Sequence, residues 1–318
     1  MDMEEKSCWN LLGAFISIFC FVIGIVGNLL TLALFYKFKK FRNNLGMFIL
    51  SLTIVDLLSC FLVIPINSCY FFFHGKWTYG EVPCFIGKIF SYATMVTTVI
   101  NIGQIAINRC FKISYSHSIY KKVFTKLNLA CMLIFSRFVG YVTAGLVSSG
   151  VGGKIVYDEE NMVCNMQSSF AFYVFIGVFS ITIVILAVCY TKIFLTFKSS
   201  KNSCQQNSDN ARATETQILK TVLATNVSFL ICFLPPTVLW FVSMDPENDI
   251  DQNVVNFFFN VPYFVSVIVN PIIYGAMNTQ YRKGYMEILT KARRAPERSM
   301  VISSIGVNGR TTSLFDTN

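Results

Sequence analysis

The stretch Ile105-Ala106-Ile107-Asn108-Arg109-Cys110 ends an apolar run of the sequence that begins near Cys84. A helix of roughly two dozen apolar residues is long enough to cross the hydrocarbon core of a bilayer. Arg109 is then expected where this helix leaves the hydrocarbon, beside the polar Asn108, within reach of a neighbouring helix or of a protein docking from the water. The alternative is an arginine that only snorkels to the membrane surface at a helix end.

The composition of the chain indicates a membrane protein. Of its 318 residues, 54% are hydrophobic and only 14% are charged, which is too apolar for an ordinary soluble domain. The acidic start of the chain and the length of the first apolar run favour a true membrane span over a cleaved signal peptide. The sequence predicts an all-α bundle of seven membrane spans, at residues 11–36, 45–72, 84–110, 127–149, 169–195, 217–243 and 253–276.

The charged residues predict the orientation of this bundle. With the N-terminus outside, 21 of the 26 lysines and arginines fall on the cytoplasmic side. The outer side holds most of the acids, among them Asp158, Glu159, Glu160, Asp245, Glu247, Asp249 and Asp251 in its loops. This bias predicts a multi-pass protein of the plasma membrane with a cytoplasmic C-terminus. It also explains the net charge of +9 without a nucleic-acid partner.

One carboxylate lies in the middle of a predicted span. An ionised Asp56 at that depth costs about 2.5–3.5 kcal/mol unless it is paired. Polar residues that can gather around it are Asn28, Thr98, Asn101 and Asn270. Asp56 is either a ligand of a structural sodium ion or a protonated acid in a hydrogen-bonded core. The candidate sodium site comprises Asp56, Thr98, Ser266 and Asn270, and no other cofactor or metal is expected.

Prolines and the end of the chain complete the predicted organisation. Pro65, Pro235 and Pro271 each remove a helical hydrogen bond inside a span and predict kinks. The expected divisions are an outer N-terminus (1–10), the bundle (11–276), an amphipathic surface helix (277–291) and a disordered cytoplasmic tail (292–318). The hydroxyl groups of the tail are candidate phosphorylation sites, at Ser299, Ser303, Ser304, Thr311, Thr312 and Ser313.

Short motifs follow one another along the spans in a fixed order. They are Gly27-Asn28, Leu52 four residues before Asp56, Asn108-Arg109-Cys110, Cys232-Phe233-Leu234-Pro235 and Asn270-Pro271-Ile272-Ile273-Tyr274. Over about residues 11–291 the chain resembles the rhodopsin-like class of G-protein-coupled receptors. Ile105 to Arg109 and Tyr281-Arg282-Lys283 resemble the melatonin-receptor-like branch and its orphan relatives.

The resemblance implies a receptor that activates a heterotrimeric G protein. It implies a disulfide between Cys84 and Cys164, and a resting-state partner for Arg109 in Glu215. Further partners that it implies are arrestin, a receptor kinase and membrane lipids. The implied activation switch comprises Asn108, Arg109, Cys110, Tyr190, Glu215, Phe229, Phe233, Pro235, Asn270, Pro271 and Tyr274. Asn108 replaces the usual aspartate and Cys110 the usual tyrosine, so we expect a looser resting state.

The resemblance also implies a small-molecule pocket in the outer half of the bundle. Its expected lining is Ser91, Tyr92, Met95, Val174, Val178, Phe233, Thr237, Trp240, Asn260 and Phe264. Ser91 stands where amine receptors have a carboxylate, which argues against an amine ligand. Phe264 stands where light sensors carry the retinal lysine, and Val178 where melatonin receptors carry a histidine.

Two other classes of protein fit the sequence less well. A transporter or channel needs further ionisable or broken segments at midplane, whereas only Asp56 and Arg137 are so placed and no repeat occurs. Arg137 is either paired or snorkelling within the bundle, or in contact with an acidic group or a lipid phosphate. An enzyme needs a catalytic cluster, but His74 and His117 are predicted on opposite sides of the membrane, so no enzyme is expected.

Overall fold

The computed structural model describes residues 3–160, 162–200, 209–243 and 251–290. In these ranges seven helices are long and apolar enough to cross a membrane, which confirms the predicted seven-span bundle. The spans are Cys8–Lys37, Asn44–Phe72, Glu81–Ser114, Lys126–Ser148, Ser169–Ser199, Thr216–Val242 and Asn253–Met277. They belong to α1 (Met3–Lys37), α2 (Asn44–Leu58) with α3 (Ile64–Phe72), α4 (Glu81–Ser114), α6 (Lys126–Ser148), α7 (Ser169–Ser200), α8 (Asp209–Ser243) and α9 (Gln252–Met277).

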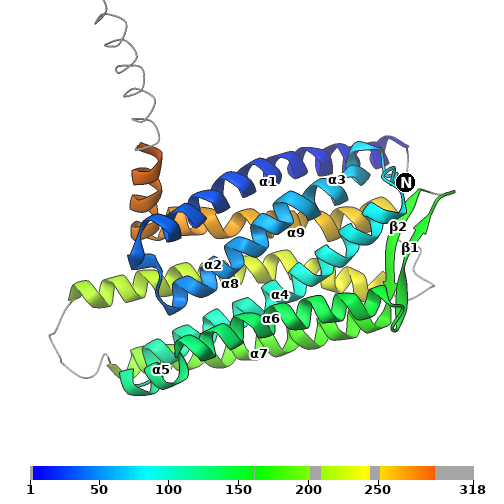
Figure 1. Cartoon of the computed structure of the whole chain (residues 1–318). Helices are drawn as coiled ribbons and strands as arrows, with labels where there is room; N and C mark the ends of the chain where they lie inside the picture. Colours follow the sequence, from blue (N-terminus) through cyan, green and yellow to red (C-terminus); the bar gives the residue numbers. More distant parts are fainter. Residues whose placement is uncertain (1–2, 161, 201–208, 244–250, 291–318) are drawn as a thin grey trace, which may run out of the picture.

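Helix α4 lies at the centre of the bundle and contacts α2, α3, α6, α7 and α8 (Figure 1). Helix α1 packs beside α9 on the other side, and α8 packs against α9. Helices α4 and α6 approach closely at Gly140, where an added Cβ would lie 2.5 Å from the carbonyl oxygen of Ala93. A small residue at this crossing lets the two backbones come together, as is usual between helices in membranes.

The second span is not a continuous α-helix. Between α2 and α3 the segment Ser59–Val63 is π-helical, and the N–H of Ile64 donates to the carbonyl of Ser59. Pro65 follows directly and has no N–H to bond the carbonyl four residues earlier, so the α-helical ladder is broken at this place. The kink expected at Pro65 therefore takes the form of a π-bulge, a feature that frequently marks functional sites.

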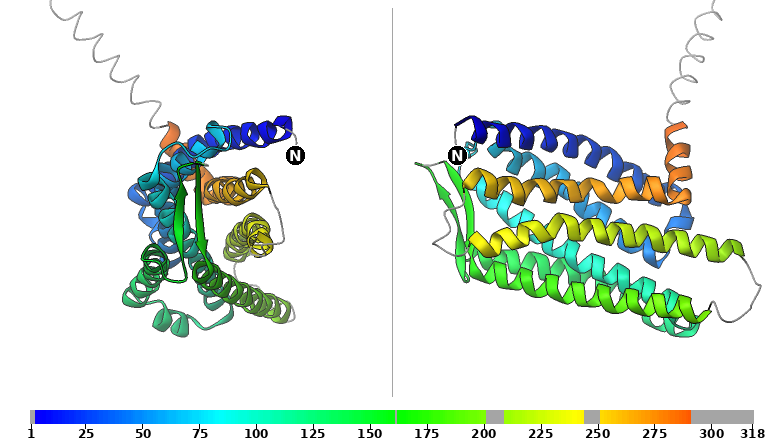
Figure 2. Two further views of the ribbon diagram at one scale, coloured as in Figure 1. Left: turned by 90° about the vertical axis from the view of Figure 1, so that its right-hand side faces the viewer. Right: turned by 180° about the vertical axis from the view of Figure 1, so that it is seen from behind.

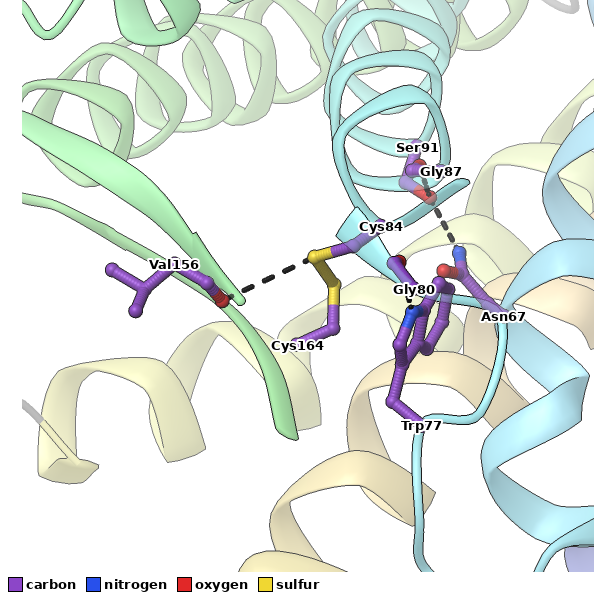
Figure 3. Close-up of a disulfide and its surroundings, with 8 residues drawn as sticks. All are labelled: Asn67, Trp77, Gly80, Cys84, Gly87, Ser91, Val156 and Cys164. Atoms are coloured by element: carbon purple, nitrogen blue, oxygen red, sulfur yellow. Dashed lines mark hydrogen bonds between the residues drawn. A yellow bond between two sulfur atoms is a disulfide. The ribbon is translucent and has the colours of Figure 1, made fainter. Parts of the chain in front are cut away.

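A β-hairpin covers one end of the bundle, the end that holds the N-terminus (Figure 2). Strands β1 (Gly153–Asp158) and β2 (Val163–Ser168) pair antiparallel in one register from Gly153 with Ser168 to Asp158 with Val163. The disulfide between Cys84 and Cys164 confirms the pairing implied by the resemblance and ties β2 to the first turn of α4 (Figure 3). We call this end of the molecule the hairpin end.

The opposite end carries a helix at residues 279–290 that runs across the bundle axis (Figure 1). Its Tyr281 ring packs against Tyr274, with 5.2 Å between ring centroids, and against Phe41 at 4.8 Å. The hydroxyls of Tyr285 and Thr31 are hydrogen-bonded at 2.7 Å. Burial raises the pKa of Tyr285 to about 12 and that of Tyr281 further, so both phenols stay neutral and the helix stays docked.

Two sets of sequence predictions fall on residues that the structure leaves out. The proposed phosphorylation sites belong to 291–318, outside the described residues. The side chain of Glu215 also lies outside them, so its pairing with Arg109 stays a prediction.

Candidate functional site

Arg109 lies near the end of α4 that is away from the hairpin. Its side chain is only 5% exposed, and Asn108 and Cys110 beside it are also buried. Asn108 donates a hydrogen bond from Nδ2 to the phenol oxygen of Tyr120, at 3.3 Å. Tyr120 belongs to α5 (His117–Val123), so the residue that replaces the usual aspartate fastens a short connecting helix to α4.

Two phenol groups from other helices lie near the buried guanidinium. Arg109 interacts electrostatically with Tyr190 of α7 and with Tyr281 of the helix 279–290. The Tyr190 phenol accepts a hydrogen bond of 2.7 Å from Nδ2 of Asn226 in α8, a contact that the sequence did not predict. The end of α4 thus interacts with α7 and with the helix 279–290, and Tyr190 links it through Asn226 to α8.

A column of aromatic rings leads from this region toward the hairpin end. Phe229 and Phe233 of α8 stack with 4.4 Å between centroids, and Phe179 of α7 lies 6.2 Å from Phe229. The column continues through Phe175 to Trp240, whose centroids are 6.2 Å apart. Pro235 and Pro236 interrupt the backbone hydrogen bonding of α8 beside this column. Rotation of the α8 segment beyond the prolines would therefore move stacked rings rather than isolated ones.

The polar cluster expected around Asp56 forms only in part. Asp56 is buried, and it accepts a hydrogen bond of 3.0 Å from Nδ2 of Asn270 in α9. Asn101 instead accepts hydrogen bonds from Ser51 and Ser136, both at 3.3 Å. Asn28 donates to the carbonyls of Gly24 and Val267. These amides do not gather around Asp56 because each helix is rotated about its axis so that its amide faces the helix packed beside it.

The other two residues of the candidate sodium site are placed as follows. Ser266 donates to the carbonyl of Tyr263 in its own helix, at 2.6 Å, and Thr98 is buried in α4. Asn270 is the one hydrogen-bond partner of the Asp56 carboxyl group among the described residues, so the group has unused lone pairs.

Tyr263 of α9 is a hydrogen-bonding centre that the sequence analysis missed. Its hydroxyl lies 2.7 Å from the hydroxyls of both Ser59 in the π-helical segment and Thr94 in α4. A phenol can donate one hydrogen bond and accept another, so both contacts can be satisfied together. Tyr263 joins three spans at one point, and its ring lies 6.4 Å from that of Phe233.

Replacing Tyr263 by phenylalanine should lower the melting temperature of the purified protein by about 2–4 °C. Hydrogen bonds between helices in membranes average about 0.6 kcal/mol each, so two are worth about 1 kcal/mol, and a protein of this size loses about 2–4 °C per kcal/mol. Ser59 and Thr94 keep bonds to backbone carbonyls, which limits the cost. Tyr173→Phe on the exposed face of α7 is the control and should change nothing. An unchanged melting temperature in Tyr263→Phe would contradict the proposed role.

The residues expected to line the ligand pocket have mixed placements. Tyr92 is buried and donates to the carbonyl of Ala171 at 3.0 Å, and Phe264 is wholly buried, so both pack the bundle as structural residues. Thr237 and Asn260 use their donors on carbonyls of their own helices. The partly exposed residues of the set are Ser91, Met95, Val174, Val178, Trp240 and Asn260.

Arg137 of α6 is paired within the bundle, as the first of the two interpretations supposed. Its guanidinium donates to the carbonyl of Leu133 at 3.0 Å and to that of Ser51 in α2 at 3.5 Å. These hydrogen bonds satisfy some of the N–H donors of Arg137. A guanidinium without partners would be costly to place inside a membrane.

Comparison with known proteins agrees with this geometry. The sequence profile of the family described as 7 transmembrane receptor (rhodopsin family) matches residues 27–274. The chain belongs to the rhodopsin family of seven-transmembrane receptors. Members of this family are receptors that cross the membrane seven times, which agrees with the seven spans of this chain.

Relatives include insect and vertebrate receptors. The G-protein coupled receptor moody of Drosophila pseudoobscura pseudoobscura is 26% identical over 91% of this chain and 54% of its own length. Its counterpart in Drosophila melanogaster is 26% identical over 84% and 49%. Melatonin receptor type 1B-B of Danio rerio is 27% identical over 87% and 81%. The chain therefore spans about half the length of the moody receptors and most of the melatonin receptor.

Proposed function

We propose that this rhodopsin-family chain is a cell-surface receptor that binds a small non-amine ligand near the hairpin end and activates a heterotrimeric G protein at the Arg109 end. The observation that carries the proposal is Arg109, buried at the end of α4 near Tyr190 and Tyr281. A buried cation at a helix end can be presented to a partner when neighbouring helices move apart. Relatives named as G-protein coupled receptors support the same partner.

The path between the two ends runs through α8. A ligand that contacts Trp240 or Met95 acts on one end of the aromatic column, and Asn226 at its other end holds Tyr190. Displacement of α8 would separate Asn226 from Tyr190 and open the space beside Arg109. The ligand can favour this state only to the extent that it binds it more tightly than the resting state.

A sodium ion at Asp56 is part of the proposal. The buried carboxyl group has one hydrogen-bond partner among the described residues, Asn270. It also interacts electrostatically with Tyr263. Sodium would neutralise the carboxylate and stabilise the resting arrangement of α2 and α9. The alternative is that Asp56 is protonated. Lowering the pH would then stabilise the protein in the way that sodium is otherwise expected to.

The test of the proposed function is a panel of reporters of nucleotide exchange, one for each class of G protein, in cells that express the chain. At least one reporter should give a signal that rises with surface expression without added ligand, because Asn108 contacts Tyr120 rather than supplying a charge beside Arg109. A panel that stays at the level of untransfected cells, for both the chain alone and a screen of ligand classes, would contradict the proposal.

We further propose that the hairpin end faces outward and the helix 279–290 faces the cytoplasm. The excess of lysine and arginine on the side of that helix supports this orientation. An epitope tag at the N-terminus should bind antibody on intact cells, and a tag after Thr317 should bind only after permeabilisation. The reverse pattern would reject the orientation. On this orientation, arrestin and a receptor kinase are expected partners of the cytoplasmic tail, and lipids surround the spans.

A further inference from the structure

Lys88 is a cation at the hairpin end to which the proposed function gives no role. It lies on the same face of α4 as Cys84, four residues before, and Tyr92, four residues after. The side chain is partly buried and interacts electrostatically with the Cys69 thiol of α3. Among the residues that the structure describes, none forms a hydrogen bond or ion pair with its ammonium group. Lys88 is thus a charge that solvent or a ligand can reach, without a counter-ion in the described chain.

Asn67 of α3 supplies a second observation at the same place. Its side chain is only 3% exposed, and its Nδ2 donates a hydrogen bond of 2.6 Å to Oγ of Ser91 (Figure 3). The Ser91 hydroxyl in turn donates to the carbonyl of Gly87, also at 2.6 Å. The Oδ1 atom of Asn67 is buried and has no hydrogen-bond partner among the described residues. A buried acceptor left in this state costs about 1–3 kcal/mol, which a ligand that donates to it would recover.

Lys88 and Asn67 both lie at the contact between α3 and α4, since Lys88 of α4 interacts with Cys69 of α3 and Asn67 of α3 is hydrogen-bonded to Ser91 of α4. A Cβ added at Gly87 would lie 3.2 Å from Oδ1 of Asn67, so this oxygen faces α4 immediately before Lys88. Ser91 completes the set one turn further along α4. Apolar residues from α3, α4 and the hairpin pack together beside the site, including Cys69, Trp77 and Ile155. The site therefore combines one cationic donor and one neutral acceptor in apolar surroundings.

None of the described carboxylates of the hairpin end, Asp158 included, forms an ion pair with Lys88. Glu81, Glu159 and Glu160 are exposed to solvent. Asp251 accepts hydrogen bonds from the backbone and side chain of Asn253. The site has a hydroxyl at Ser91, a lysine one turn earlier and no described carboxylate. Its polarity suits an anionic group rather than an amine.

We propose that Lys88 and Asn67 bind the polar end of the ligand, and that this end is a carboxylate with an N–H or O–H group beside it. N-acylated amino acids and 2-hydroxy acids have this chemistry. The carboxylate accepts a charge-assisted hydrogen bond from Lys88, the N–H or O–H donates to Oδ1 of Asn67, and an apolar body extends past Met95 into the bundle. This inference rests on the proposed function because it places the ligand at the same end of the bundle.

The test measures binding to the purified full chain by thermal unfolding, without a G protein. The probes are N-acetylphenylalanine, N-acetylleucine and 3-phenyllactate, each beside its methyl ester. At least one acid should raise the melting temperature at a concentration where its ester does not. Lys88→Gln should weaken that acid about 10- to 100-fold, because a hydrogen bond to a charged group is lost, and Lys88→Arg should restore most of the affinity. Lys154→Gln, an exposed lysine of β1, is the matched control and should bind as the unchanged chain does.

Asn67→Leu separates the two contacts. It should weaken N-acetylphenylalanine about tenfold but leave 3-phenylpropionate, which has no N–H or O–H beside its carboxylate, unchanged. The proposal is overturned if no acid stabilises the chain more than its ester, or if Lys88→Gln keeps the preference for the acid. Because the readout is binding alone, a chain that binds acids but activates no G protein would reject the proposed function and leave this site standing.

Discussion

Arg109→Ala should abolish signalling through the G protein while the receptor still reaches the cell surface. The arginine is buried at the end of α4 and interacts with phenols of α7 and of the helix 279–290, so it is the cation that opening of the bundle would present. Signal per surface receptor should fall below about a tenth of that of the unchanged chain, a loss that corresponds to about 1.4 kcal/mol or more in the active-state equilibrium.

The measurement compares reporter signal with surface labelling of the same cells. Arg42→Ala is the matched control, because Arg42 is an exposed arginine at the same end whose guanidinium donates, among the described residues, to the backbone carbonyls of Phe35 and Tyr36. It should keep the full signal at equal surface expression. If Arg109→Ala couples as well as Arg42→Ala, the switch is not at the end of α4.

Loss of either cysteine of the disulfide should reduce surface expression several-fold. The bond between Cys84 and Cys164 closes a loop of 80 residues and fixes the hairpin over the end of the bundle. Removing a native disulfide commonly costs about 2–5 kcal/mol, which is enough to send much of a marginally stable protein to degradation.

The two cysteines should also behave as one unit. Cys84→Ser, Cys164→Ser and the double variant should show nearly the same loss, because the second change removes nothing that the first has left. Cys131→Ser serves as the control, since Cys131 is a free and exposed thiol of α6 and its change should be silent. Additive losses in the double variant would show that the thiols act separately.

Several features of this protein can be predicted from the local sequence. The seven spans, the kink positions at the prolines and the cation at the end of α4 follow from hydropathy, from missing N–H donors and from charge position, which are properties of the chain near each residue. The observed spans differ from the expected ones by a few residues at most. The pairing of Cys84 with Cys164 came from family resemblance rather than from any local property.

The sequence alone therefore determined that seven helices cross a membrane and which of them carry buried polar residues. Tertiary structure decided which polar residues meet, because this depends on how each helix is rotated about its own axis. Asn101 is hydrogen-bonded to Ser51 and Ser136 instead of Asp56, Tyr263 is hydrogen-bonded to Ser59 of the π-helical segment and to Thr94 of α4, and the Oδ1 of Asn67 faces α4. A hydroxyl or amide in an apolar helix must find a partner, but its own sequence neighbours do not specify which helix provides it.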